Sequence, residues 1–312
     1  MKNYGDEKEC LILNTSMLCI VVLHKNLWCI AFRKIFIYNL PMPTVKEMGA
    51  FKRAVYVYYH KHKRDLPWRH TKNPYHILVS EIMLQQTQVQ RVEVKYREFL
   101  RAFPTVKALA TASLADVLRV WQGMGYNRRT KMLHEAANVI VRDYHGRVPR
   151  DMKTLMTFPG IGPSTAGGIC AYAYNMPVVF IETNIRRVYI HHFFADRRGV
   201  TDAEIFPLVE ATLNRNHPRE WYSALMDYGT HLALTTENPN RKSKGYMRQK
   251  PFKGSDREVR GTILKILAEG PRSQVFLFKH LPFNKERIIH ILENLERESL
   301  ITHKKTIYVL GS

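Results

Sequence analysis

Apolar side chains recur at three- and four-residue intervals along most of residues 51–234, and the runs are interrupted at proline or glycine. This spacing matches the 3.6-residue turn of an amphipathic helix, whereas few stretches alternate with the two-residue period of a half-buried strand. Clusters of proline and glycine at residues 66–74, 123–125 and 159–163 predict turns between the helices. The pattern therefore predicts an all-α main domain.

The end of the chain follows a different pattern. Three short helical stretches and then a pair of apolar strands follow one another at residues 256–269, 273–280, 284–299 and 300–310. That order predicts a small winged-helix-like module. Because its last helix carries both basic and acidic side chains, the sequence leaves open whether the module contacts DNA or another protein.

These patterns divide the chain into four parts. We expect an N-terminal extension at 1–41, a main domain at 42–240, a basic linker at 241–254 and the winged-helix-like module at 255–312. The extension contains an apolar run, but His24 interrupts it well before the ~20 residues that span a bilayer. We therefore expect no membrane partner, and we interpret the extension as a disordered segment or as the product of a misplaced start.

The charge balance narrows the class of partner. Lys and Arg number 48 against 27 Asp and Glu, which gives a formal net charge of +21. A balance this basic favours a polyanionic partner, above all nucleic acid, although an inert basic surface is the alternative. The four cysteines form no paired metal-ligand spacing, so neither a zinc site nor a disulfide scaffold is expected.

The stretch SEIMLQQTQV at residues 80–89 places one acid among three glutamines. If one helix continues through it, Glu81, Gln85 and Gln88 share a face, opposite an apolar stripe that would face the core. A solvated polar face is the ordinary explanation. Amide side chains, however, suit the edges of nucleic-acid bases, which offer both donors and acceptors.

A second candidate site lies in LMTFPGIGPSTAGG at residues 155–168. Gly160 and Gly162 allow a sharp turn, and Ser164 and Thr165 open the following helix. Backbone N–H groups and the positive end of the helix dipole would form a neutral cradle for phosphate. The pattern is that of a helix-hairpin-helix motif, which contacts DNA without reading its sequence, although a plain interhelical turn is the alternative.

A second acid, Glu182, stands where a helix begins in VVFIETNIRRV. There the helix dipole and nearby N–H groups favour the ionised form, whereas apolar walls around Glu81 would raise its pKa. Two acids in unlike environments suit an acid-catalysed cleavage. Glu182 could equally be a simple helix cap.

Five ordered motifs carry a resemblance that covers about residues 48–235. They are LPWR (66–69), SEIMLQQTQV (80–89), WQGMGYNRR (121–129), FPGIGPSTAG (158–167) and ETNIRRV (182–188). Together they resemble the MutY-type adenine DNA glycosylases of the helix-hairpin-helix superfamily. The resemblance implies two α-helical subdomains with a cleft between them, into which a nucleotide of mismatched double-stranded DNA is extruded. It also implies a monomer in the cytoplasm, associated with the nucleoid.

The resemblance assigns roles to particular residues. It implies that Glu81 protonates the leaving adenine and handles the attacking water, that Glu182 occupies the position of an aspartate that stabilises the cationic sugar, and that Asn184 supports that acid. Ser164 stands where related lyases have a lysine, so base excision without strand cleavage is implied. The adenine pocket would be lined by Leu66, Trp68 and Arg69. Residues expected at the DNA are Gln85, Gln86, Gln88, Tyr126, Gly160, Gly162, Ser164 and Thr165, of which Gln86 and Tyr126 would wedge into the base stack.

The chain departs from the family in three ways. Glutamate replaces aspartate at Glu182, which moves the carboxylate by about 1.5 Å at full extension. The four cysteines of an iron–sulfur cluster are missing after Leu232, so neither a cofactor nor a metal is expected. The larger C-terminal domain that recognises 8-oxoguanine is replaced by the short module. Release of thymine or uracil opposite guanine, or DNA binding without catalysis, therefore remain alternatives.

Overall fold

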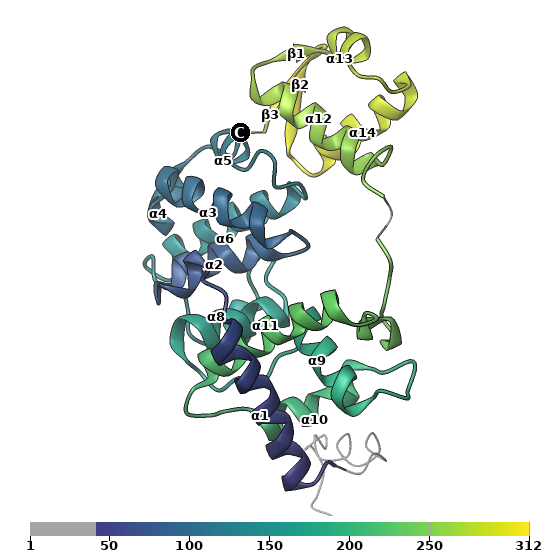
Figure 1. The fold of residues 1–312 in the computed structure, drawn as a ribbon. Coiled ribbons are helices and arrows are strands. Elements are labelled where there is room, and N and C mark those ends of the chain that lie inside the picture. Colours follow the sequence, from purple (N-terminus) through teal and green to yellow (C-terminus); the bar gives the residue numbers. More distant parts are fainter. Residues whose placement is uncertain (1–41, 250, 312) are drawn as a thin grey trace, which may run out of the picture. The chain divides into compact units, whose positions relative to one another are not determined.

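The computed structural model describes residues 42–249 and 251–311, so the expected extension at 1–41 lies outside the described residues. The described chain is mainly helical and confirms the predicted fold class (Figure 1). The helices of the main part are α1 (Val45–His62), α2 (Pro74–Leu84), α3 (Val89–Ala102), α4 (Val106–Thr111), α5 (Leu114–Val120), α6 (Arg128–Asp143), α7 (Met152–Leu155), α8 (Pro163–Tyr174), α9 (Thr183–Phe193), α10 (Asp202–Thr212) and α11 (Pro218–Thr235). Two short 3-10 helices, η2 (Pro67–Arg69) and η3 (Pro239–Lys242), accompany them.

Helices α2 to α8 enclose one hydrophobic core. Its buried side chains come from residues 66–173, and large fully buried members include Phe99 and Trp121, whose rings meet edge to face at 5.7 Å. Helix α2 packs directly against α8. This contact brings the glutamine-rich stretch next to the predicted hairpin.

A second group of helices joins the two ends of the main part. Helix α1 packs against α11, and α11 packs against α9 and α8 (Figure 1). Phe51 of α1 is buried against Tyr189 of α9 and Trp221 of α11, with ring centroids 5.2 and 5.9 Å away. The start of α1 is fixed by a capping box between Thr44 and Glu47. The N-terminal helix therefore completes the subdomain that carries Glu182.

The expected continuous helix through residues 80–99 is wrong. Helix α2 ends at Leu84, Gln86 has a left-handed φ of 53°, and α3 begins at Val89 with Gln88 as its N-cap. Gln88 is consequently exposed and does not share the face of Glu81. The apolar stripe survives the break because Ile82 and Val92 reach the same core from two helices.

The C-terminal module has the elements of a winged helix. Helices α12 (Asp256–Ala268), α13 (Gln274–His280) and α14 (Lys285–Arg297) pack with strands β1 (Arg272–Ser273), β2 (Ile301–Lys304) and β3 (Ile307–Leu310). The strands form an antiparallel sheet in the order β1-β3-β2. Leu114 and Leu118 of α5 belong to the same hydrophobic core as this module, so it is packed onto the main part.

Part of the expected basic linker belongs to the folded body. Asn240 in η3 is buried, and its side-chain amide donates to the Thr183 carbonyl at 2.9 Å. Ser243, which directly follows η3, forms an isolated parallel bridge with Val200. Residues 239–244 are therefore docked on the main part through backbone and amide hydrogen bonds.

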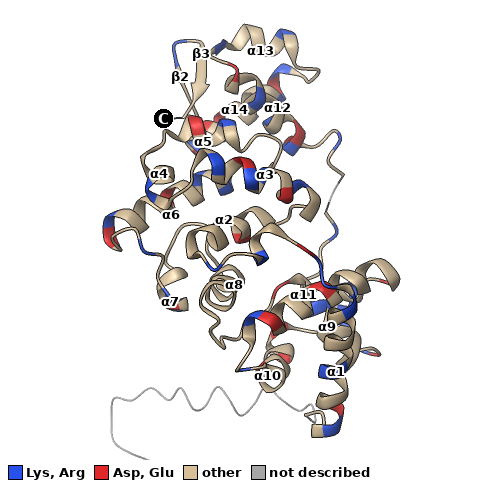
Figure 2. Ribbon diagram, turned by 60° about the vertical axis from the view of Figure 1, so that its left-hand side comes forward, with Lys and Arg blue, Asp and Glu red and all other residues tan. Residues whose placement is uncertain are grey.

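Basic side chains are spread over helices from all parts of the described chain and over the segment before α12 (Figure 2). No helix among the described residues is long and apolar enough to cross a membrane.

Candidate active site

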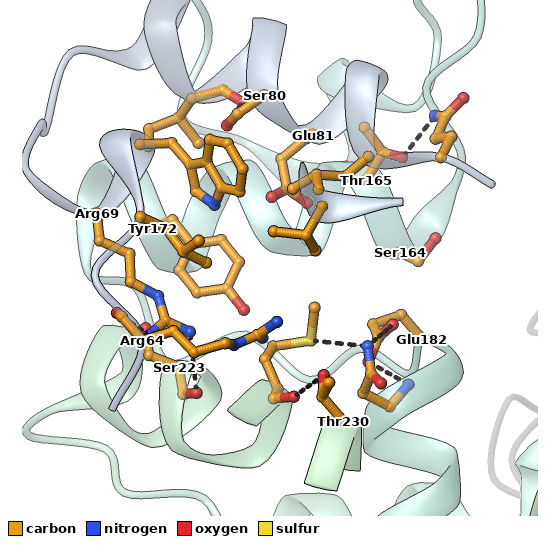
Figure 3. A pocket seen from close by; sticks show the side chains of 18 of the residues that line it. Arg64, Arg69, Ser80, Glu81, Ser164, Thr165, Tyr172, Glu182, Ser223 and Thr230 are labelled. Carbon is orange, nitrogen blue, oxygen red and sulfur yellow. Dashed lines mark hydrogen bonds between the residues drawn. The ribbon is translucent and has the colours of Figure 1, made fainter. Parts of the chain in front are cut away.

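A cavity of about 700 Å³ lies where α2 and α8 face α9 and α11. Both predicted acids, Glu81 and Glu182, line it, so the two side chains on which the sequence interpretation depends share one space (Figure 3). The lining also contains Arg64, Leu66, Trp68, Arg69, Gln85, Gln86, Gly162, Ser164, Thr165, Tyr172, Asn184, Ser223, Met226 and Thr230. The cavity is large enough for a single nucleobase with its sugar.

Glu81 lies in α2 and reaches toward α8. A Cβ atom added at Gly168 would stand 2.3 Å from Glu81 Oε2, so glycine is what allows the carboxyl to lie against this helix. No described group donates a hydrogen bond to the carboxyl. Burial, followed by the charge of Glu182, raises the pKa of Glu81 to about 8. Glu81 can therefore hold a proton at neutral pH.

Glu182 is the N-cap of α9. Its Oε1 accepts hydrogen bonds from the backbone N–H groups of Asn184 at 2.5 Å and Ile185 at 2.7 Å. The Asn184 side-chain amide donates to Oε2 at 3.3 Å, and Arg187 Nη1 in turn donates to Asn184 Oδ1 at 2.6 Å. Glu182 is therefore a helix cap that also faces the cavity, and its catalytic role remains a prediction.

Burial outweighs these contacts. It raises the pKa of Glu182 above its ordinary value, although the N–H groups of Ile185 and Asn184 and the charge of Arg187 act in the opposite direction. Two neighbouring buried carboxyls do not both ionise readily, so the pair retains a proton more strongly than separate acids would. Because donors surround Glu182 and no described donor reaches Glu81, the proton belongs on Glu81.

The expected pocket residues line the cavity together. Leu66 and Trp68 are buried, and the Trp68 ring meets Tyr96 edge to face at 5.6 Å. Arg69 forms a two-pronged ion pair with Asp227, with both N–O distances at 2.8 Å. This pairing fixes the guanidinium plane at the cavity wall.

Asp227 is a site residue that sequence reasoning missed. It also accepts from the backbone N–H of Arg64 at 3.0 Å and from Arg64 Nε at 2.5 Å, and its side chain is 1% exposed. Burial alone would raise the pKa of Asp227, but Arg69 and Arg64 outweigh burial and lower it. Its only signal was one acid in an otherwise apolar stretch of α11, which no spacing rule connects to residues 64–69.

The hairpin has the expected geometry, with one shift. Gly160 has a φ of +74°, and a Cβ atom there would lie 2.8 Å from Met132 Cβ, so glycine is required. Gly162 is the N-cap of α8, which opens one residue earlier than expected. Ser164 lines the cavity, and a Cβ atom added at Gly162 would meet no neighbouring described atom within 4 Å. The backbone at the start of α8 is therefore open to a ligand.

Gln85 and Thr165 bind each other. Gln85 Nε2 donates to Thr165 Oγ1 at 3.0 Å and to the Gly160 carbonyl at 3.2 Å. These bonds tie the break after α2 to the hairpin. The structure therefore gives both residues a protein partner, and their contact with DNA remains a prediction.

Arg129 is a second residue that was missed, although it ends one of the quoted motifs. Its Nη1 donates to the carbonyls of Ile82 and Met83, at 2.9 Å each, and to that of Gln85. Its Nη2 donates to Thr87 Oγ1 at 2.9 Å. Burial lowers the pKa of Arg129 to about 10, so it keeps its charge at neutral pH. One guanidinium thus caps α2 directly after Glu81.

The two expected wedge residues differ in their surroundings. Gln86 is exposed and lines the cavity, whereas Tyr126 is outside the lining. Both have left-handed backbone angles, φ 53° and 48°. The Tyr126 hydroxyl accepts from Arg257 Nη1 at 3.0 Å and from Gln249 Nε2, so the segment before α12 touches it.

The residues present do not fit an iron–sulfur cluster. The sequence has no cysteine after Cys170, and thiolates are the ligands that such a cluster requires. Where the family's ligands would follow Leu232, Asn238 caps η3 and accepts from Arg187 Nε at 3.2 Å, while Asn240 holds Thr183. Amide hydrogen bonds therefore anchor this segment to α9, directly beside Glu182.

Comparisons with known proteins identify similar sequences and structures. The family model "HhH-GPD superfamily base excision DNA repair protein" matches residues 79–210. An adenine DNA glycosylase of Mycobacterium tuberculosis is 37% identical over 287 residues, which cover 84% of this chain and 94% of that protein. A human adenine DNA glycosylase is 33% identical, over 62% of this chain and 38% of its own length. The solved structure of a thermostable thymine-DNA glycosylase is 25% identical with a TM-score of 0.55, over 63% of this chain and 92% of its own.

Proposed function

Because the chain belongs to the HhH-GPD superfamily of base excision DNA repair proteins and, within it, to the MutY-type adenine DNA glycosylases, we propose that it removes adenine paired with 8-oxoguanine or guanine from duplex DNA. The chain is thus a DNA N-glycosylase, a hydrolase of base excision repair. The observation that carries the proposal is the shared cavity, with a proton-holding Glu81 on one side and a capped Glu182 on the other.

The two acids have different roles in the proposed reaction. Glu81 gives its proton to a ring nitrogen of the extruded adenine as the bond to the sugar breaks, and the bonding electrons leave with the base. Positive charge then develops on the sugar, and this charge favours the ionised form of Glu182. A water molecule completes the hydrolysis and leaves an abasic site. Asn184 keeps the Glu182 carboxylate in place through its amide.

Ser164 supports hydrolysis without strand cleavage. It lines the cavity at the start of α8, where a lysine would be able to form a Schiff base with the sugar. A serine hydroxyl has no nitrogen with which to form this intermediate. The expected product is therefore an intact strand with an abasic site.

The DNA would meet the cavity along three features. The N–H groups at the start of α8 and the open Gly162 suit a phosphate, Gln86 stands exposed at the cavity, and the basic side chains supply the electrostatic attraction. Gln249 of the segment before α12 and Arg257 in the first turn of α12 both donate to the Tyr126 hydroxyl, so these parts of the chain lie beside the expected wedge. We propose that the enzyme works as a monomer. We also propose that it works without an iron–sulfur cluster, because the sequence supplies no thiolate ligands after Cys170.

The experiment that tests the function is a panel of defined duplexes. The purified protein is incubated with adenine opposite 8-oxoguanine, adenine opposite guanine, thymine opposite guanine and uracil opposite guanine, and the released base is identified by mass. We expect adenine alone to be released, and the Glu81→Gln variant to be slower by about 100-fold or more while it still binds the duplex. Release by that variant at the parent's rate would contradict the chemistry.

Thymine release opposite guanine is the second candidate. The solved thymine-DNA glycosylase that resembles this chain shares its fold over 63% of the chain. The same panel separates the two candidates, since thymine would then be the base recovered.

A further inference from the structure

The Tyr172 hydroxyl is a buried polar group to which the mechanism above assigns no role. Tyr172 lies in α8 and lines the cavity. Its hydroxyl oxygen is buried and has no hydrogen-bond partner among the described residues. Figure 3 shows the hydroxyl below Glu81, pointing into the cavity that Glu81 and Glu182 both line.

An unpartnered hydroxyl at this place is costly to the folded protein. A buried polar group that forms no hydrogen bond loses its water contacts without replacement, and native structures contain few of them. Two other tyrosine hydroxyls nearby have protein acceptors, since the Tyr222 hydroxyl donates to the Val178 carbonyl at 2.6 Å and the Tyr174 hydroxyl donates to that of Val148. The Tyr172 hydroxyl is therefore available to donate a hydrogen bond to a ligand that enters the cavity.

We propose that the Tyr172 hydroxyl donates a hydrogen bond to the extruded adenine and stabilises the negative charge that develops on the base as its bond to the sugar breaks. This role rests on the proposed adenine excision. The hydroxyl keeps its proton throughout, while Glu81 supplies the proton that the base carries away. A donor held in a dry cavity acts more strongly on the developing charge than on the neutral base, so it accelerates the chemical step rather than binding.

The surroundings keep Tyr172 a donor. Burial, and then the charges of Glu81 and Glu182, raise the pKa of Tyr172 well above its usual value, whereas Arg69 acts in the opposite direction. The phenol is consequently neutral at every pH at which the protein works. Since no hydrogen bond joins it to a described residue, its proton is free for a base that enters the cavity.

The test compares Tyr172→Phe with Tyr174→Phe. Both remove one phenolic hydroxyl from α8, but the Tyr174 hydroxyl has a protein partner and that residue is outside the cavity lining. For Tyr172→Phe we expect the single-turnover rate of adenine release to fall by about 10- to 100-fold, with the duplex Kd within about twofold of the parent. We expect its Tm to be unchanged or higher, because no hydrogen bond is lost. Tyr174→Phe should show a lower Tm and an adenine-release rate close to that of the parent.

A second measurement reports on the charge of the leaving base. A duplex is used in which the adenine is replaced by a purine analogue whose leaving form is a weaker base. Less negative charge then needs stabilisation, so the fall in release rate caused by Tyr172→Phe should be smaller than with adenine. An equal fall in Tm and in rate for both variants would show a structural role and overturn the inference, as would a Tyr172→Phe rate equal to that of an active parent. A parent that releases no adenine would overturn the proposed function, and this inference with it.

Discussion

Glu81 and Glu182 are the same kind of side chain, and their surroundings give them different tasks. Glu182 accepts two backbone N–H bonds and one from Asn184, whereas no described group donates to Glu81. Hydrogen bonds to the charged form favour ionisation, and burial without them favours the protonated form. The proton of the pair therefore stays on Glu81, which is the acid that faces α8.

The pH dependence follows from this arrangement. With the pKa of Glu81 raised to about 8, adenine release should fall as pH rises through this value. The acid limb should reflect protonation of Glu182, whose pKa is raised above its ordinary value of 4.5. Single-turnover rates measured across this range check the profile. A rate that keeps rising well above the pKa of about 8 would contradict Glu81 as the acid.

The same pKa predicts an effect on stability. The folded state binds the Glu81 proton more tightly than the unfolded chain, whose glutamate has a pKa of 4.5, so this group makes stability fall as pH rises from about 4.5 to about 8. Glu81→Gln removes the slope. Its Tm should exceed that of the parent near the upper end of this range, and the difference should shrink toward the lower end.

Glu182→Asp tests the departure from the family aspartate. An aspartate at an N-cap also accepts from the second and third N–H groups of a helix, here those of Asn184 and Ile185. We expect adenine release to be retained or faster, and the unfolding free energy to stay within about 0.5 kcal/mol. Glu182→Ala, the control, loses the cap at a cost of about 1 kcal/mol and should lose most activity. A large loss in Glu182→Asp would show a site built around the longer acid.

At the scale of elements, Arg129 holds the end of α2 to the start of α6. It donates to three carbonyls of residues 82–85 and to Thr87, and so supports the break that follows Glu81. These hydrogen bonds of Arg129 were not predictable, because the sequence alone does not distinguish a buried arginine from a surface arginine. Arg128, its neighbour, is exposed.

Arg129→Ala should be strongly destabilising. It removes a charged donor from three carbonyls. The Met83 carbonyl then has no described donor, whereas the Ile82 and Gln85 carbonyls keep the Gln85 N–H at 3.4 Å and Thr87 Oγ1 at 3.3 Å. Hydrogen bonds to charged groups contribute about 1.5–3 kcal/mol each, so we expect a loss of at least about 3 kcal/mol, together with slower adenine release. Arg128→Ala is the matched control and should change stability by less than about 0.5 kcal/mol. Thermal and urea unfolding followed by circular dichroism measure both. Similar shifts for the two variants would contradict this role of Arg129.

What the sequence revealed depends on how local each feature is. The apolar period predicts a helical main domain and the winged-helix elements, and the cap at Glu182 is visible as ETN at a helix start. The break at Gln85 to Gln88 was hidden because Ile82 and Val92 stay in phase across it. Asp227 was hidden for another reason, since its partners lie 158 and 163 residues away and only the folded chain brings them together.

At the scale of the whole molecule, the charge of +21 should govern affinity for DNA. Basic side chains are spread over the described helices, and each one that meets a phosphate releases a counterion from the duplex (Figure 2). We expect the logarithm of the binding constant to fall linearly with the logarithm of salt concentration, by about 0.9 per phosphate contact. A flat salt response would contradict binding driven by this charge.

The contribution of a single arginine to this salt dependence can be tested by substitution. Arg91 is exposed in the first turn of α3, two residues after Val89, which lines the cavity. Arg142 is also exposed, but it pairs with Asp143 at 2.7 Å near the end of α6. Arg91→Gln should therefore lower the slope by about one contact, whereas Arg142→Gln should leave it unchanged, because a paired arginine has less charge to offer a phosphate. Fluorescence anisotropy with a labelled duplex at several salt concentrations measures both slopes. The reverse order of the two variants would place the DNA on a different face of the molecule from the cavity.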